Sequence, residues 1–288
     1  MLVTLKEVME IAEADNFAIG AFNTPNLESV EAVIGAAEDL RLPVIIQFAQ
    51  CHEELIPLEV IGPVMVAAAQ RAAIPVCVHL DHGETLEYLK KALNIGFTSI
   101  MYDGSNLSDE ENVRNTQKAV SLAESFGADV EAELGSMGKR ESGKGDLEGA
   151  GENEKIYTDP IQAGKFVDAT KITALACSFG TTHGIYLTEP QLNFDIVRKV
   201  RQQTLNIPVV MHGGSGVSRE DFHQAITAGV RKINYFTYMD RESGMKVRER
   251  IKQQPDNEPL HYTEIIKIAV EAMRENIKNA IAVFAFRD

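Results

Sequence analysis

An acid and two histidines lie together in residues 75–84, PVCVHLDHGE, where the sequence changes from apolar to polar. The apolar run predicts a buried strand that carries His79, with Asp81 two residues later. Because strand side chains alternate between faces, His79 and Asp81 point the same way, and His82 lies where the alternation lapses. Strand ends of this kind are where proteins of alternating strands and helices place catalytic groups. The alternative is a core histidine followed by an acid that caps the next helix.

The composition excludes some classes of partner. The chain has 288 residues, 44% of them hydrophobic and 24% charged, and a formal net charge of −14. Nucleic-acid binding needs clustered cations, so this charge argues against a nucleic-acid partner. A small phosphorylated compound remains compatible, because a few backbone N–H groups can bind it.

The cysteines and the first residues bear on the compartment. Cys51, Cys77 and Cys177 have no paired spacing, and we interpret them as small core residues in a reducing compartment. The opening segment, MLVTLKEVMEIAEADNF, predicts an amphipathic helix with acids throughout rather than a signal peptide. No apolar run is long enough to cross a bilayer. We therefore expect a cytoplasmic protein without a membrane partner.

Eight predicted strands alternate with helices. The strands are expected at 18–23, 43–50, 75–80, 98–105, 129–135, 172–180, 207–216 and 230–237. The helices are expected at the N-terminus and at 26–40, 56–73, 84–96, 109–126, from 158–160 onward, 190–205, 218–229, 239–253 and 262–284. Eight such units predict an α/β fold, a single (β/α)8 TIM barrel with extra N- and C-terminal helices. An open doubly wound sheet is the alternative, but its GxGxxG fingerprint is missing.

One segment, about 136–156, breaks this pattern. It is rich in glycine and charged residues and has no periodicity. We expect a mobile active-site loop within a single domain, 1–288, because long loops in compact domains are usually functional. The alternative is a disordered surface insertion.

Polar residues lie at the exit of every predicted strand. They are Asn23, Gln47, Asp81 with His82, Asp103, Glu133, His183, His212 and Asn234. In a closed barrel these ends converge on one mouth, and three of them carry a histidine. Three neutral imidazoles with an open fourth position suit a catalytic zinc ion.

The remaining histidines and the glycine-rich turn receive simpler interpretations. His79 is expected to support the site from behind the metal ligands. We expect His52, His223 and His261 to be solvated rather than ligating. Residues 212–216, HGGSG, run into a helix capped by Ser218 and predict an anion site that Asn234 and Thr237 complete, although a turn alone could also explain the glycines.

Taken together, these motifs resemble those of the class II, zinc-dependent ketose-phosphate aldolases, such as the fructose- and tagatose-bisphosphate aldolases. The likeness covers nearly the whole chain. Its motifs are AFN at 21–23, HLDHG at 79–83, EAELG at 131–135, YTDP at 157–160, GTTHGIY at 180–186 and HGGSG at 212–216.

The resemblance implies a role for each site residue. Asp81 matches the acid/base that handles the C4 hydroxyl proton, and Glu141 matches the carboxylate that exchanges a proton on the dihydroxyacetone unit. The implied zinc ligands are His82, His183 and His212, with Asp103 and Glu133 at an alternative metal position. The implied substrate-binding residues are Asn23, Gly184, Gly213, Gly214, Ser215, Asn234, Tyr235, Phe236 and Thr237. A monovalent cation is a further candidate cofactor, and the chain is expected to form a homodimer or homotetramer.

The sequence departs from the family pattern at positions that contact phosphate. Many members have Lys where this chain has Leu187, and a polar residue where it has Phe236; Tyr235 is also unusual. No Asp-Pro-Arg segment is present to supply a distal-phosphate arginine. We therefore expect reversible cleavage of a ketose phosphate to dihydroxyacetone phosphate and an aldehyde that need not carry phosphate, with a conventional 1,6-bisphosphate aldolase as the alternative.

Two further hypotheses compete with an aldolase. A zinc hydrolase on the same fold would want an HxH pair on the first strand, which AFN does not offer. A non-catalytic sugar-phosphate-binding zinc barrel would not need two placed proton carriers such as Asp81 and Glu141.

Overall fold

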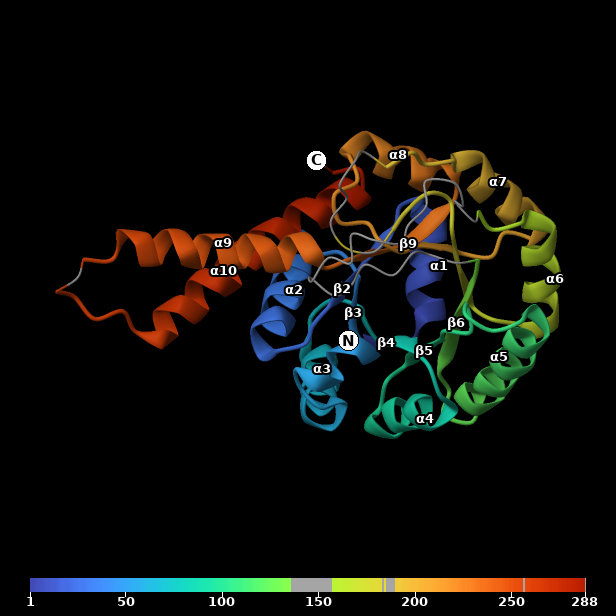
Figure 1. The fold of residues 1–288 in the computed structure, drawn as a ribbon, viewed down its shortest axis with the longest axis horizontal. Helices are drawn as coiled ribbons and strands as arrows, with labels where there is room; N and C mark the ends of the chain where they lie inside the picture. Colours follow the sequence, from blue (N-terminus) through green and yellow to red (C-terminus); the bar gives the residue numbers. More distant parts are fainter. Residues whose placement is uncertain (136–156, 183, 185–189, 256, 288) are drawn as a thin grey trace.

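A closed parallel β-barrel ringed by helices forms the body of the molecule (Figure 1). The computed structural model describes residues 1–135, 157–182, 184, 190–255 and 257–287. The barrel strands are β2 (Ile19–Asn23), β3 (Val44–Ala49), β4 (Val76–Gly83), β5 (Ser99–Tyr102), β6 (Asp129–Leu134), β7 (Ala174–Cys177), β8 (Val209–Met211) and β9 (Val230–Tyr235). Their order is β4-β3-β2-β9-β8-β7-β6-β5, and pairing of β4 with β5 closes the ring. The predicted TIM barrel is confirmed.

Helices cover the outside of the barrel between successive strands. They are α2 (Leu27–Leu40), α3 (Leu58–Arg71), α4 (Leu86–Ile95), α5 (Asp109–Glu124), α6 (Pro160–Thr170), α7 (Phe194–Gln203) and α8 (Arg219–Ala228), with a 3-10 turn, η1 (Gln50–Glu54), after β3. Side chains cap several of them as the sequence predicts: Ser218 accepts from the backbone N–H of Asp221, and Asp159 precedes Pro160 at the start of α6.

The extra N-terminal segment closes one end of the barrel. A short strand, β1 (Leu2–Val3), pairs with β4, and α1 (Leu5–Asp15) packs Leu5, Val8 and Met9 against the apolar interior. Cys77 belongs to this buried cluster and Cys177 to the main core, as predicted, but Cys51 is exposed. The interpretation of Cys51 as a core residue was wrong, because β3 ends at Ala49 and Cys51 lies in η1, outside the barrel wall.

Two C-terminal helices form an antiparallel arm that extends away from the barrel (Figure 1). They are α9 (Thr237–Gln253) and α10 (Tyr262–Phe284), and the C-terminal part of α10 packs Phe284 into the core. The expected C-terminal helices are therefore present. The last strand ends at Tyr235, however, and Thr237 already belongs to α9 rather than to the strand predicted at 230–237. No helix among the described residues is long and apolar enough to span a membrane.

Candidate active site at the carboxyl ends of the strands

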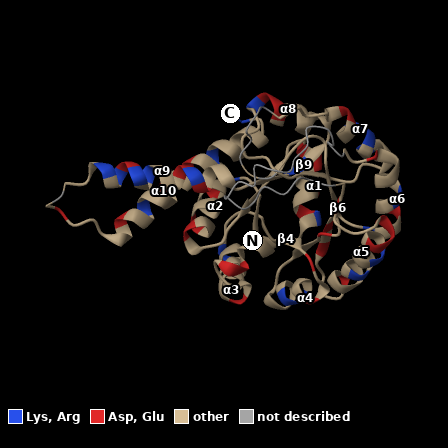
Figure 2. Ribbon diagram, viewed as in Figure 1, with Lys and Arg blue, Asp and Glu red and all other residues tan. Residues whose placement is uncertain are grey.

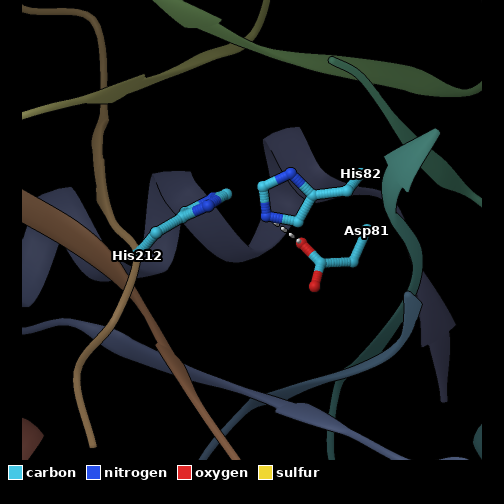
Figure 3. Close-up of side chains that lie close together, drawn as sticks. All are labelled: Asp81, His82 and His212. Carbon is cyan, nitrogen blue, oxygen red and sulfur yellow. Dashed lines mark ion pairs between the residues drawn. The ribbon is translucent and has the colours of Figure 1, made fainter. Parts of the chain in front are cut away.

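The end of β4 carries the residues that the sequence singled out. His82 has a φ of 49°, in the left-handed region, and the pairing of β4 with β5 shifts register between Leu80 and Gly83. This irregularity breaks the alternation, so neighbouring residues Asp81 and His82 both reach the same site, with His82 Nε2 3.9 Å from Asp81 Oδ1 (Figure 3). The predicted lapse of alternation is present, although β4 continues to Gly83 instead of ending at Leu80.

Three amide side chains hold the Asp81 carboxylate. Asn23 Nδ2 and Gln47 Nε2 donate to Asp81 Oδ2 at 3.0 and 3.2 Å, and Asn234 Nδ2 donates to Oδ1 at 3.2 Å. Burial alone would raise the pKa of Asp81, but the nearby His82, His212 and Lys232 lower it to about 2. Asp81 is therefore an ionised, oriented acceptor within the site.

His82 is surrounded by acids. Its Nδ1 lies 2.8 Å from Asp103 Oδ2, and Asp103 also accepts from the Ser105 hydroxyl at 2.6 Å. Burial favours the neutral imidazole, but Asp81, Asp103 and Glu133 outweigh burial and raise the pKa of His82 to about 10. A divalent cation in the same place would provide the positive charge that this cluster of acids favours.

His212, after β8, approaches the same point from the opposite wall. Its ring centroid lies 4.8 Å from that of His82, and its Nδ1 lies 3.8 Å from Glu133 Oε2. Figure 3 shows the His212 ring directed toward His82 and Asp81. Burial raises the pKa of Glu133 to about 8 despite the proximity of His82, and its Oε2 has no hydrogen-bond partner among the described residues.

These side chains can hold a metal ion. One ligand atom from each of Asp81, His82 and His212 lies within 4.8 Å of the others, and the same holds for His82, Asp103 and Glu133. Buried imidazole and carboxylate donors suit zinc, and the spare oxygen of Glu133 lacks the partner that a metal would supply. The residues present therefore fit a zinc ion. His183, the third predicted imidazole, and Glu141 lie outside the described residues.

The glycine-rich turn after β8 packs closely against neighbouring backbone. Gly213 has a φ of 68°, and a Cβ there would lie 2.4 Å from Thr182 O. Gly214 N donates to Asn234 O at 3.0 Å, and the Ser215 hydroxyl accepts from Phe236 N at 3.3 Å. The loops after β8 and β9 therefore form one unit, and Thr237 opens α9 beside it. Gly184 also has a left-handed φ, of 92°.

Two predicted substrate-binding side chains have contacts of other kinds. Tyr235 packs edge-on against Phe22 and Phe284, and its hydroxyl bonds Asn276 Oδ1 at 3.1 Å. Phe236 lies edge-on to His52, with ring centroids 5.2 Å apart. Any phosphate contact from these two residues would come from the backbone.

The expectation that three histidines are solvated holds only for His261, which is exposed. His52 is half-buried beside Phe48 and Phe236. His223 bonds Val283 O at 3.1 Å and lies against Phe286. The expectation was wrong for both, because Phe236 lies against the ring of His52 and Phe286 lies against the ring of His223.

The sequence analysis missed Glu131 and Lys232, which are fully buried beneath His212. Glu131 bonds His212 Nε2 at 2.9 Å and Lys232 Nζ at 2.7 Å. The alternation of strand side chains could have indicated that both face the barrel interior. Glu131 precedes Glu133 by two residues, and Lys232 precedes Asn234 by two.

Comparison with known proteins decides the family. Residues 3–288 match the family described as fructose-bisphosphate aldolase class-II. The chain belongs to the class II fructose-bisphosphate aldolase family. As a class II aldolase, it is a carbon–carbon lyase that catalyses aldol cleavage of a ketose phosphate. Members of this family are generally zinc-dependent.

Relatives of this aldolase cover almost its full length. It is 36% identical to a probable fructose-bisphosphate aldolase from Bacillus subtilis strain 168 over 280 residues, 96% of this chain and 95% of the relative. It is 35% identical to the sulfofructosephosphate aldolase of Alkalicoccus urumqiensis over 281 residues, 97% and 95% of the two chains. The crystal structure of the YdjI aldolase from Escherichia coli K12 superposes with a TM-score of 0.86 at 35% identity, covering 99% of this chain and 97% of the other.

Proposed function

We propose that this aldolase uses a bound zinc ion to cleave a ketose phosphate to dihydroxyacetone phosphate and an aldehyde that need not carry phosphate. The observation that carries the proposal is the convergence of Asp81, His82 and His212, whose ligand atoms lie within 4.8 Å of one another at the barrel mouth. It combines imidazoles that suit zinc with an ionised carboxylate that can accept a proton.

The proposed zinc ligands are His82, His183 and His212, and Asp103 and Glu133 offer an alternative metal position. When bound, zinc acts as a Lewis acid that stabilises negative charge developing on the substrate oxygens. His82 belongs to two groups of possible ligands, one with Asp81 and His212 and one with Asp103 and Glu133. This sharing supports two nearby positions for the ion. A monovalent cation stays a further candidate.

Asp81 is proposed to accept the proton of the C4 hydroxyl when the C3–C4 bond breaks. The amides of Asn23, Gln47 and Asn234 hold both carboxylate oxygens, which fixes the direction from which Asp81 meets substrate. Glu141, proposed to exchange the proton on the dihydroxyacetone unit, lies in 136–156, outside the described residues.

Backbone N–H groups after β8 and β9 are proposed to bind the phosphate of the dihydroxyacetone unit. The hydrogen bond between Ser215 and Phe236 joins the two loops, and the N-terminus of α9 adds a favourable dipole. The proposed contacts come from Gly184, Gly213, Gly214, Ser215, Asn234, Tyr235, Phe236 and Thr237.

The aldehyde half distinguishes this proposal from a conventional fructose- or tagatose-1,6-bisphosphate aldolase. The chain has Leu187 where many members have Lys, and it has no Asp-Pro-Arg segment. One charged phosphate contact contributes about 1.5–3 kcal/mol, or roughly one to two decades of specificity. A non-catalytic sugar-phosphate-binding barrel is the alternative of another class, and the ordered, ionised Asp81 argues against it.

The test compares kcat/KM for fructose and tagatose 1,6-bisphosphates with the corresponding 1-phosphates, in zinc-loaded protein. We expect the 1-phosphates to be at least as good substrates. A preference of more than about tenfold for the bisphosphates would show that the chain is a conventional 1,6-bisphosphate aldolase. Turnover that persists after chelation would contradict the zinc proposal, and absence of turnover with zinc bound would favour the non-catalytic barrel.

We infer further that a second copy of the chain contacts the arm formed by α9 and α10. The arm exposes apolar side chains, with Met245 42%, Ile251 51% and Tyr262 73% exposed. Both basic and acidic residues lie along α9 (Figure 2), so the arm of a second copy offers charges of either sign for pairing. Light scattering should give a dimer or tetramer that Ile251→Glu weakens and the control Leu205→Glu, at a residue 92% exposed, does not. A monomeric wild type would contradict this.

The remaining expectations stay predictions. They are the single-domain organisation of residues 1–288 with a mobile loop at about 136–156, and the cytoplasmic location.

A further inference from the structure

A buried ion pair lies beneath the candidate metal site. Lys232 Nζ on β9 is 2.7 Å from Glu131 Oε2 on β6, and both side chains are fully buried. Glu131 Oε1 lies 2.9 Å from His212 Nε2, while Oε2 lies 3.6 Å from His79 Nε2. None of the chemistry above uses Lys232 or Glu131.

Strand periodicity explains why this layer lies under the mouth. Glu131 is two residues before Glu133 on β6, and Lys232 is two residues before Asn234 on β9, so each pair faces the barrel interior. His79 likewise lies two residues before Asp81 on β4. Its Nδ1 is hydrogen-bonded to the Ser99 hydroxyl at 2.7 Å. Removing one partner of a buried ion pair leaves an uncompensated charge, so replacing either Glu131 or Lys232 alone should destabilise the fold.

Hydrogen-bond chemistry assigns the proton on His212. An ammonium group only donates and an ionised carboxylate only accepts, so Glu131, paired with Lys232, must accept from His212 Nε2. Nε2 therefore carries the hydrogen. In the neutral ring, which is the form that can bind a metal, the unprotonated nitrogen is then Nδ1, which lies 3.8 Å from Glu133 Oε2.

We propose that Lys232 and Glu131 are positioning residues that fix His212 in the Nε2–H tautomer and so direct the lone pair of Nδ1 into the metal site. This inference rests on the proposed zinc function and deepens it. A hydrogen-bonded carboxylate behind a ligating histidine fixes ring orientation and tautomer, and its loss typically costs about 10–100-fold in metal affinity.

A change from carboxylate to amide separates positioning from packing. In Glu131→Gln the amide oxygen will turn toward the Lys232 ammonium, because two donors repel one another. The amide NH2 then points at His212 Nε2 and favours the Nδ1–H tautomer, which cannot ligate. We expect zinc affinity to fall about 10–100-fold.

Removing the lysine as well should partly restore binding. In Glu131→Gln with Lys232→Met, nothing holds the amide oxygen away from His212, so it can accept from Nε2 again. We expect the double variant to bind zinc about tenfold more tightly than Glu131→Gln alone. Purely structural damage would instead accumulate. Glu53 and Lys91, an ion pair of 3.0 Å on η1 and α4, provide the matched control as Glu53→Gln with and without Lys91→Met.

Two readouts decide the matter. Competition with a chelating dye gives zinc affinity, and ¹⁵N-histidine spectra of the metal-free wild type report the His212 tautomer without any substitution. An Nε2–H signal for His212 and partial rescue in the double variant support the inference. An Nδ1–H wild type, or a double variant no tighter than Glu131→Gln, overturns it. A wild type that binds no zinc refutes the proposed function, while the tautomer measurement still decides this inference.

Discussion

Glu131 and Glu133 are the same residue type, two positions apart on β6 and both buried, yet their surroundings differ. Glu131 contacts Lys232 and His212 through its two oxygens. Glu133 has an oxygen without a hydrogen-bond partner among the described residues, and burial raises its pKa to about 8. The lower residue belongs to a completed ion pair, whereas the upper one keeps a free ligand atom.

The two histidines of β4 show the same difference. Burial, reinforced by Lys232, lowers the pKa of His79 well below its usual value, so this imidazole is neutral. His82 is almost as deeply placed, but Asp81, Asp103 and Glu133 raise its pKa to about 10 against the effect of burial. Neighbouring charge, rather than depth alone, therefore separates a supporting layer from a layer with the charges that a metal ion needs.

The largest expected effect is on catalysis in the upper layer. Asp81→Ala should lower kcat for cleavage by about two to four orders of magnitude, because a placed general base is lost. Proton exchange on dihydroxyacetone phosphate should persist, since the C4 proton takes no part in it. Steady-state assays and isotope exchange measure the two steps. Loss of bound zinc in this variant would show that Asp81 is structural.

Stability should separate the two glutamates. In metal-free protein, Glu131→Gln should lower the free energy of unfolding by about 3–5 kcal/mol, because it breaks a buried ion pair. Glu133→Gln should cost less than about 1 kcal/mol, since a neutral side chain suits that position already. Urea denaturation in the presence of a chelator measures both. Equal losses would contradict the distinction between the layers.

The raised pKa of His82 predicts how metal-free stability depends on pH. Because its folded pKa of about 10 exceeds the usual 6.5, its contribution is fully present below pH 6.5 and is lost as pH rises through 10. Between pH 6 and 10 the loss should be on the order of 4 kcal/mol relative to His82→Gln. Denaturation series from pH 6 to 10 compare the two proteins. A parallel pH dependence would show that the acids do not hold a charged His82.

The smallest effect concerns a residue outside both layers. Tyr235→Phe removes only the hydrogen bond to Asn276 and should cost about 0.5–1.5 kcal/mol of stability. Its kcat/KM should not change, because the ring packs on Phe22 and Phe284. A rise in KM would instead place the Tyr235 hydroxyl in contact with substrate.

Much of the fold could be predicted because strand–helix alternation is a local pattern. The strand ends were less predictable. β9 ends at Tyr235 although the apolar Phe236 follows it, and β8 spans only Val209–Met211 because the turn HGGSG begins at His212. The same alternation located Asp81, His82 and His212 at one mouth, and the structure brings them together.

The supporting layer was harder to foresee. A lysine within VRKINY resembles a solvated strand residue until a partner is known, and Glu131 lies about a hundred residues away. Which charges meet depends on the curvature of the closed barrel, which turns β6 and β9, separated by β7 and β8, toward one interior. Periodicity could predict that Glu131 and Lys232 face inward, but not that they contact each other and His212.

Anomalous diffraction at the zinc edge, from crystals grown with zinc, tests the central claim most directly. The account predicts one zinc peak at the mouth, about 2.0–2.1 Å from His212 Nδ1 and from His82 Nε2, with Glu131 still bonded to His212 Nε2. A peak at His212 Nε2, or no peak at these histidines in protein that cleaves ketose phosphates, would contradict it.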